Sequence, residues 1–384
     1  MGTPMIRVAF DATACLGVRT GVGRFASEVL ERLAAHPELE VTAFAVSWRG
    51  RDALVDAVPP GVRVVTRPMA ARPLRVAWTR ADFPCIESWT GPVDLVHGPN
   101  YVVPPSRHAA RLVTVHDLTP LRFPELANRD TRTYPALIAR AVRAGAWVQT
   151  PTEFVRSEVI EHFAVAPERV VAVPYGVTPP TPESDRSDAA AGRRLVGSDR
   201  YVLALGTVEP RKDLTALIAA FDVVAASDNE LRLVIAGQDG WGADAVAAAQ
   251  RDARHADQVV RLGHVDEAAR AALLRGATVL AYPSRYEGFG LPPLEAMDVG
   301  VPVVCTDAGS LPEVLGDAAH FVDADLLGRD REAGVASLAG ALHRVTTDAT
   351  WRDELVVRGR TRAAGYTWEK TASAMVGLYR RIVG

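Results

Sequence analysis

Short apolar runs alternate with amphipathic stretches along the whole chain. The apolar runs have the length and boundaries of buried strands. They lie at 6–11, 41–46, 62–65, 94–97, 112–116, 147–150, 170–174, 201–205, 231–236, 258–262, 277–282 and 301–305. Segments with helical periodicity follow many of them, for example at 133–144 and 152–163. Strands that alternate with helices predict an α/β protein built on parallel sheets.

The length of 384 residues exceeds what one ordinary core accommodates, so two domains are expected. We predict a first domain over residues 1–178 and a second over 199–367. The stretch 179–198 is rich in Pro, Asp, Ser and Ala and is interpreted as a linker. A last helix is predicted over 368–384, with Thr367 as its N-cap.

Composition excludes several classes of protein. The net charge is −3, which leaves no global basic field for nucleic acid. The three cysteines are scattered, so neither a disulfide framework nor a zinc site is expected, and a cytoplasmic location is favoured. No apolar run approaches the roughly 18 residues of a membrane-spanning helix. Among 43 basic residues only Lys212 and Lys370 are lysine, so a lysine at 212 stands out.

The stretch 286–300 predicts a strand, a glycine turn and a helix. The turn is Gly288, Phe289, Gly290 and Leu291. Backbone N–H groups at a helix start have no intrahelical partner and form a binding site for anions, phosphate above all. Glycine lets a ligand approach the backbone closely. The turn is therefore a candidate phosphate site.

Two carboxylates flank this turn, Glu287 in the loop and Glu295 one turn into the helix. For either residue alone, an acid that suits the helix dipole is the favoured explanation. Together they suggest a ligand with hydroxyl groups, because an ionised carboxylate accepts hydrogen bonds from two neighbouring hydroxyls. Phosphate at the amides with hydroxyls at each Glu describes a nucleoside diphosphate sugar, its ribose at Glu295 and its sugar at Glu287.

Arg211 and Lys212 follow another predicted strand, at the start of a helix. Cations are unfavourable at that end of a helix, which argues for a bound anion. A planar guanidinium and a compact ammonium are complementary partners for phosphate. Two exposed cations without a ligand are the alternative.

In the first half, Gly21 and Gly23 follow the first predicted strand as a Gly-x-Gly turn. A tight turn that packs helix on strand is the usual explanation of such a pair. His97 and His116 end two further strands, where side chains face a ligand crevice in parallel sheets. A lone histidine at such a position more often has a structural role. Both histidines are kept as candidates for a functional one.

The segment 66–89 interleaves arginine with tryptophan and phenylalanine. Such a pattern suits contact with a membrane surface or an anionic acceptor. An ordinary amphipathic helix with a solvated basic face is the favoured interpretation.

Several of these motifs carry a family resemblance. Glu-Gly-Phe-Gly-Leu-Pro-Pro-Leu-Glu at 287–295 resembles the E-x7-E signature of family 4 retaining glycosyltransferases. Glu-Pro-Arg-Lys at 209–212, His-Asp-Leu at 116–118 and the Gly-x-Gly turn resemble further motifs of that family. Thr207 departs from the pattern, because many members have arginine directly after the preceding glycine.

The resemblance implies the GT-B fold, with two Rossmann-like domains facing a cleft and the last helix packed back on the first domain. It implies donor binding by Gly21, Gly23, Arg211, Lys212, Val265, Glu287, Gly288, Phe289, Gly290, Leu291 and Glu295. Val265 would lie beside the nucleobase. The implied catalytic set is His116, Glu287, Arg211 and Lys212, and the acceptor would bind the first domain.

The implied reaction moves a hexose from a nucleotide sugar, with retention and without metal or other cofactor. GDP-mannose is the first expectation for the donor and a UDP-sugar such as UDP-glucose the second. The acceptor would be a glycan, a lipid-linked saccharide or a small molecule. No nucleic-acid partner is expected. Peripheral contact with the inner membrane face through the first domain is a further hypothesis.

Three alternatives stay open. A nucleotide-sugar-binding protein without turnover would keep the 289–291 turn and Glu295. A dinucleotide oxidoreductase would need a Gly-x-Gly-x-x-Gly motif and a downstream acid, and the motif tolerates the Ala26 found at its third position here. A sugar phosphorylase of related fold would require inorganic phosphate.

Overall fold

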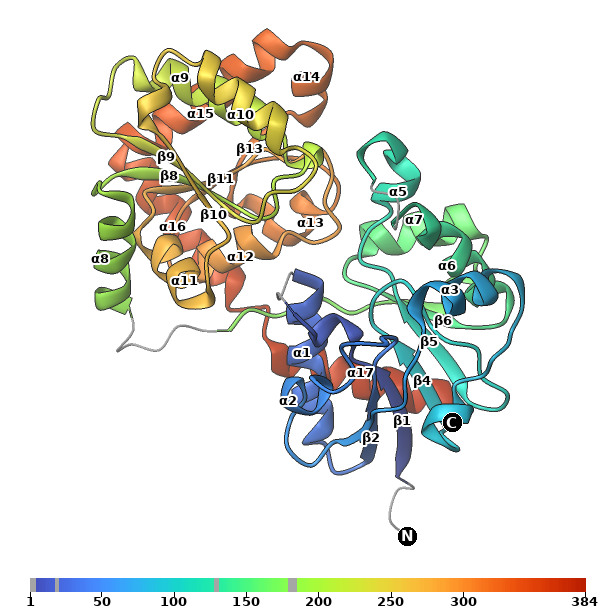
Figure 1. Ribbon diagram of the computed structural model, residues 1–384. Helices are drawn as coiled ribbons and strands as arrows, with labels where there is room; N and C mark the ends of the chain where they lie inside the picture. The colour runs from blue at the N-terminus through green and yellow to red at the C-terminus, as the bar shows by residue number, and fades with distance from the viewer. Residues whose placement is uncertain (1–4, 18–20, 128–130, 179–184) are drawn as a thin grey trace. The chain divides into compact units, whose positions relative to one another are not determined.

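The computed structural model describes residues 5–17, 21–127, 131–178 and 185–384. The chain forms two compact units (Figure 1). Unit 1 runs to Gly176 and also includes Thr367–Gly384, and unit 2 comprises Val177–Tyr366. Each unit is built on one parallel sheet, so the predicted fold class is confirmed.

The sheet of unit 1 has seven strands in the order β3-β2-β1-β4-β5-β6-β7. Every pair of neighbours is parallel. The strands are β1 (Ile6–Asp11), β2 (Leu39–Phe44), β3 (Arg63–Val65), β4 (Leu95–Gly98), β5 (Ala110–Thr114), β6 (Trp147–Thr150) and β7 (Val170–Ala172). Most of their residues are buried, as expected for strands covered on both faces.

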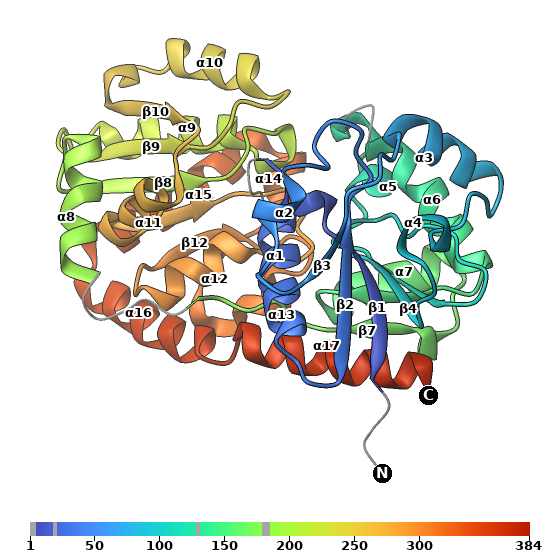
Figure 2. The same cartoon turned by 60° about the horizontal axis from the view of Figure 1, so that its bottom comes forward.

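The helices of unit 1 cover both faces of this sheet. They are α1 (Gly21–Ala34), α2 (Leu54–Ala57), α3 (Ala71–Arg80), α4 (Glu87–Thr90), α5 (Thr119–Arg122), α6 (Tyr134–Arg143), α7 (Glu153–Phe163) and α17 (Trp368–Val383). Figure 2 shows α1 on one side of β1 and β2, with α3 and α6 on the other.

The last helix, α17, is anchored to unit 1 by side chains. Thr367 caps it by accepting a hydrogen bond from the Lys370 amide at 3.2 Å, as the sequence predicted. The Tyr379 hydroxyl lies 2.7 Å from Nδ1 of the buried His97. Arg380 forms an ion pair with Glu38 at 2.6 Å. The chain therefore returns from unit 2 to complete unit 1.

Unit 2 has a six-stranded parallel sheet in the order β10-β9-β8-β11-β12-β13. Its strands are β8 (Tyr201–Leu205), β9 (Arg232–Ala236), β10 (Val259–Gly263), β11 (Val279–Tyr282), β12 (Val303–Thr306) and β13 (His320–Val322). Its helices are α8 (Asp185–Val196), α9 (Leu214–Ala225), α10 (Ala243–Asp252), α11 (Glu267–Gly276), α12 (Leu291–Asp298), α13 (Leu311–Leu315), α14 (Ala324–Arg329), α15 (Arg331–Thr347) and α16 (Ala349–Ala363). β13 was not predicted, because three residues beginning with a histidine form no apolar run.

The segment predicted as a linker contains a helix. α8 occupies Asp185–Val196, and the remainder at 179–184 lies outside the described residues. A run of alanine and arginine favours helix, although it lacks the large apolar residues that we required. α8 packs on α11 through small residues instead. A Cβ at Gly192 would lie 2.1 Å from the Ala272 carbonyl oxygen, so the two backbones are in close contact.

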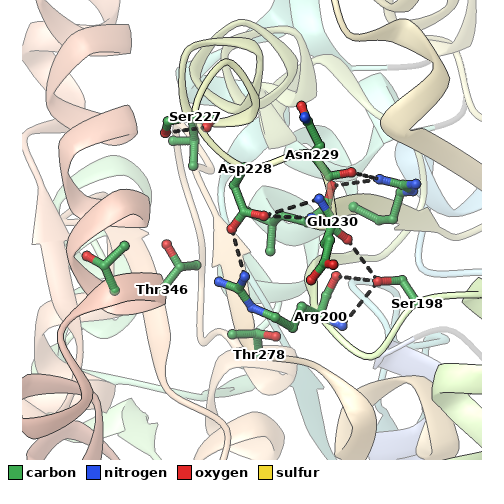
Figure 3. Close-up of polar contacts among 12 residues, drawn as sticks. Ser198, Arg200, Ser227, Asp228, Asn229, Glu230, Thr278 and Thr346 are labelled. Carbon is green, nitrogen blue, oxygen red and sulfur yellow. Dashed lines mark hydrogen bonds and ion pairs between the residues drawn. The ribbon is translucent and has the colours of Figure 1, made fainter.

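Polar contacts connect the segments that precede β8 and β9 in the unit 2 sheet (Figure 3). Arg200 forms an ion pair with Asp228 at 2.9 Å. The Ser198 hydroxyl donates to the carbonyl oxygens of Arg200 and Glu230, both at 3.0 Å. These bonds give hydrogen-bond partners to backbone carbonyl groups where β8 and β9 begin, so this end of the sheet has a structural role.

The α8–α11 contact predicts opposite effects for the same substitution at two glycines. Gly192→Ala forces two helix backbones apart and should lower the free energy of unfolding by about 1–3 kcal/mol. Gly340→Ala, in α15 of the same unit, meets nothing within 4 Å and should raise it by up to about 1 kcal/mol. Urea denaturation of both variants checks this. Equal effects would show that α8 does not pack as described.

Candidate functional site

The candidate site of unit 2 lies where the sheet order reverses. β8 and β11 are neighbours at the centre, and successive strands are added outward from each. In parallel sheets, ligands bind beyond the carboxyl ends of the strands at such a switch point. The loop after β8 carries Arg211 and Lys212, and the loop after β11 carries Glu287. The topology therefore brings the predicted residues together.

The carboxylate of Glu287 is held by both cations. Its Oε1 lies 2.6 Å from Lys212 Nζ and 2.8 Å from a terminal nitrogen of Arg211. Arg211 is fixed further by Glu209, whose carboxylate accepts from Nε at 2.9 Å. Glu287 and Lys212 are 6% and 8% exposed, so the cluster is desolvated. Within water-poor surroundings these charges interact strongly.

The protonation of this cluster follows from its charges. Burial alone would raise the pKa of Glu287, but the charges of Arg211 and Lys212 outweigh it and lower that pKa to about 2. Burial and the charge of Arg211 lower the pKa of Lys212, and the Glu287 carboxylate opposes them. Glu287 is therefore a permanent anion that holds two cations in place.

Lys212 has donor capacity beyond this ion pair. Its ammonium also donates to the Tyr282 hydroxyl and lies 4.2 Å from the centroid of that ring. An ammonium carries three N–H bonds, and two have partners among the described residues. The third is available to a ligand.

The glycine turn is tightly built. Gly290 caps α12 with φ +95°, a left-handed conformation that glycine adopts without strain. A Cβ there would also lie 2.6 Å from Leu311. The Phe289 ring packs edge-on against Tyr366 with centroids 5.9 Å apart. The 288–291 backbone is therefore held in one shape at the helix start.

The loop after β12 forms hydrogen bonds to the backbone of Glu287. The Ser310 amide and hydroxyl both donate to the Glu287 carbonyl oxygen at 3.0 Å. Gly309 has φ +61°, and a Cβ there would lie 2.4 Å from that same oxygen. The loop thus fixes the backbone from which the carboxylate extends.

Glu295 has a partner that the sequence analysis missed. Arg270 of α11 forms an ion pair with its carboxylate and a second one with Glu267 at 3.2 Å. Glu295 is 7% exposed, so the guanidinium compensates a nearly buried charge. The feature of the sequence that could have indicated this pairing is the position of Arg270, one turn into the helix that follows β10. The pairing fixes the carboxylate predicted to bind ribose.

In unit 1, both ring nitrogens of His116 have protein partners. Nε2 lies 2.8 Å from the Pro99 carbonyl oxygen and therefore donates, while Nδ1 accepts from the Tyr175 hydroxyl. Burial lowers the pKa of His116 to about 4, so the ring is neutral near pH 7. His97 is similarly enclosed by Thr114 and Tyr379. A bond from His116 to a sugar would replace one of these contacts.

The remaining predicted donor residues lie in α1 and after β10. Gly21 and Gly23 form the first turn of α1 rather than a loop before it. Val265 follows β10 and is half-buried. Within the described residues, no three of His, Cys, Asp and Glu are grouped so that they could hold a metal ion. The part of the chain that the structure describes also contains no helix long and apolar enough to cross a membrane.

The basic and aromatic segment 66–89 forms α3, α4 and their connections. Trp78 is buried, with its indole N–H donating to the Pro84 carbonyl oxygen at 3.1 Å. Trp78 thus belongs to the core, which agrees with the favoured interpretation. Val76 and Phe83 are 52% and 63% exposed.

Two Rossmann-like units, each built on a parallel sheet, are the architecture of GT-B glycosyltransferases. Comparison with known proteins agrees. Residues 19–179 match the family model "Glycosyltransferase Family 4", and residues 185–329 match "Glycosyl transferases group 1". The chain belongs to the family 4 glycosyltransferases and is an enzyme of that class.

One relative is similar to nearly the whole chain, and two solved structures share its fold. The chain is 28% identical to O-antigen chain mannosyltransferase B of Escherichia coli, over 94% of this chain and 96% of the relative. It superimposes on sucrose-phosphate synthase of Thermosynechococcus elongatus with a TM-score of 0.75 and 20% identity, covering 98% of both chains. HepE of Anabaena, solved with UDP and glucose, gives a TM-score of 0.72 at 14% identity, over 98% of this chain and 100% of HepE.

The pKa of Glu287 predicts how unit 2 responds to acid. Folding lowers this pKa from 4.5 to about 2, so the stabilisation is complete above pH 4.5 and is lost as the pH falls toward 2. By pH 3 the loss should reach about 2 kcal/mol. Urea denaturation between pH 6 and 3 should show this loss in the parent chain but not in Glu287→Gln.

The exposed Glu332→Gln serves as the control and should follow the parent chain. If the parent and Glu287→Gln curves ran parallel over this pH range, Glu287 would not carry a buried charge.

Proposed function

We propose that this protein is a retaining, metal-independent glycosyltransferase that moves a hexose from a nucleoside diphosphate sugar to an acceptor hydroxyl. The observation that supports this best is the buried cluster of Glu287, Lys212 and Arg211 at the switch point of unit 2. The cluster holds two cations between the carboxylates of Glu287 and Glu209, and Lys212 retains a donor among its described contacts. It suits the diphosphate of a leaving nucleotide.

In the proposed step, the bond between the anomeric carbon and the diphosphate oxygen breaks. The acceptor oxygen forms its bond to the same face of that carbon, and its proton passes to the departing diphosphate. Lys212 and Arg211 stabilise the negative charge that develops there, together with amides of the 289–291 turn. Holding both substrates in line provides the rest of the rate enhancement.

Other residues bind the donor in this proposal. Glu295, oriented by Arg270, accepts from the ribose hydroxyls, and Val265 lies beside the base. Glu287 accepts from the sugar. Gly21 and Gly23 of α1 approach the phosphates, and His116 contacts the sugar as a neutral imidazole after exchanging one of its protein partners.

Mannose carried on GDP is the proposed donor. The Glu-Pro-Arg-Lys loop resembles that of mannosyltransferases, and the relative from E. coli is named a mannosyltransferase. A UDP-sugar is the alternative, because the similar fold of HepE was solved with UDP and glucose. The acceptor in this proposal is a glycan, a lipid-linked saccharide or a small molecule.

A cytoplasmic location and peripheral contact with a membrane stay predictions. The exposed face of α3 would provide that contact, because Arg72, Val76 and Arg80 lie four residues apart along it.

Turnover tests the proposal with the two lysines as a matched pair. Lys212→Gln should reduce kcat/KM for transfer from GDP-mannose or UDP-glucose by about 100-fold or more, because the diphosphate loses a preorganised cation. The exposed Lys370→Gln should keep full activity. The parent enzyme should work equally well in EDTA, and the product should retain the anomeric configuration by NMR.

Strict dependence on a divalent metal, or inversion at the anomeric carbon, would contradict the mechanism. A requirement for inorganic phosphate would favour a phosphorylase. Nucleotide binding without transfer to any acceptor would favour a binding protein.

A further inference from the structure

The switch point of unit 1 also contains a small polar hollow. β1 and β4 are neighbours where the strand order reverses. Asp11 is the last residue of β1, and Asn100 follows the end of β4. The hollow is lined by these two residues together with Thr13, Arg75, Trp78, Ala14, Val46 and Val102. The predicted donor residues of unit 1 are not among them.

Polar groups in this hollow lack partners among the described residues. Asp11 uses Oδ1 to accept from the Thr13 amide at 2.9 Å and from its hydroxyl, and no bond to Oδ2 is formed by the described chain. Arg75 has a buried Nε without a hydrogen-bond partner in the described structure. The side-chain amide of Asn100 likewise makes no hydrogen bond to any described residue.

Among these groups, Arg75 Nε is a buried atom without a partner in the described structure, and such atoms are costly and rare in folded proteins. Asp11 is 8% exposed, and its burial raises the pKa to about 6, against the Thr13 hydrogen bonds and the charge of Arg75. Near neutral pH the carboxylate is thus ionised in a desolvated position. A ligand that both donates and accepts hydrogen bonds would relieve this cost.

The walls of the hollow are fixed before any ligand arrives. Thr13 accepts from the Val46 amide at 2.7 Å and so ties the ends of β1 and β2 together. The loop after β4 is tight, because a Cβ at Gly98 would lie 1.9 Å from the Val102 carbonyl oxygen. Tyr101 adopts φ +59° there, a strained conformation for a bulky residue that is typical of functional sites. Asn100 is therefore held in place by its own loop.

Size and charge select the ligand. The hollow has a volume of about 20 Å³, which accommodates one water or one hydroxyl group. A hydroxyl can donate to Asp11 and accept from Arg75 or Asn100. A phosphate would gain from Arg75 but would be repelled by the ionised Asp11. A neutral polyol therefore suits the site better than an anion.

We propose that Asp11, Arg75 and Asn100 form a subsite for a hydroxyl of a neutral saccharide. This inference rests on the proposed function, because it makes the subsite the place where unit 1 holds the acceptor sugar. The switch point of unit 2 then binds the charged donor, and that of unit 1 binds the uncharged acceptor.

Saturation-transfer NMR with methyl α-D-mannopyranoside as the probe tests the subsite without requiring turnover. Arg75→Gln and Asn100→Ala should each weaken binding of this pyranoside at least about fivefold, since each removes a partner for one hydroxyl. Arg72→Gln, on the exposed face of the same helix, should leave it unchanged. Asp11→Asn should weaken pyranoside binding as Arg75→Gln and Asn100→Ala do. It also alters the hydrogen bonds that Asp11 accepts from Thr13.

A second arm measures binding of GDP and UDP by calorimetry, which should stay within twofold of the parent value in all four variants. If neither nucleotide binds the parent chain, the proposed function fails, while the pyranoside experiment still stands. If folded Arg75→Gln and Asn100→Ala bind the pyranoside as the parent does, the subsite is wrong. Tighter binding of myo-inositol 1-phosphate than of the pyranoside would overturn the preference for a neutral ligand.

Discussion

The buried carboxylate of Glu287 is the constraint on which the site of unit 2 depends. It lies after β11, whereas Arg211 and Lys212 lie after β8, so its ion pairs join the two strands that flank the switch point. Without that anion, two neighbouring cations would repel each other in desolvated surroundings. Ser310 and Gly309 fix the backbone of Glu287 in turn. The sheet thereby holds two cations in place where phosphate is expected.

The two units use the same topology for different chemistry. Each has a parallel sheet whose order reverses at its centre, and each gathers polar side chains at the carboxyl ends of the two central strands. In unit 2 these are cations beside a glycine turn, which suits a diphosphate. In unit 1 they are a carboxylate and an amide, which together with a guanidinium from α3 suit a hydroxyl.

Residue patterns predicted much of the fold and of the candidate site. The rest depends on contacts between elements that only the structure shows. Apolar runs predicted β1 to β12, since buried parallel strands need such runs, and glycine at 290 indicated the turn. The sequence placed Lys212 and Glu287 in one site but not in one ion pair, because 75 residues separate them. Arg270 and the hollow at Asp11 were missed, since each depends on contacts across elements. α8 was missed because small residues mediate its packing.

The central claim is that the cation cluster of unit 2 recognises a diphosphate. Calorimetric titration of the unmodified protein with guanosine, GDP, uridine and UDP tests it most directly. We predict that the preferred nucleoside diphosphate binds at least about 100-fold more tightly than its nucleoside, a difference of about 2.7 kcal/mol that shrinks as salt is added. Equal affinity for nucleoside and nucleoside diphosphate would contradict it.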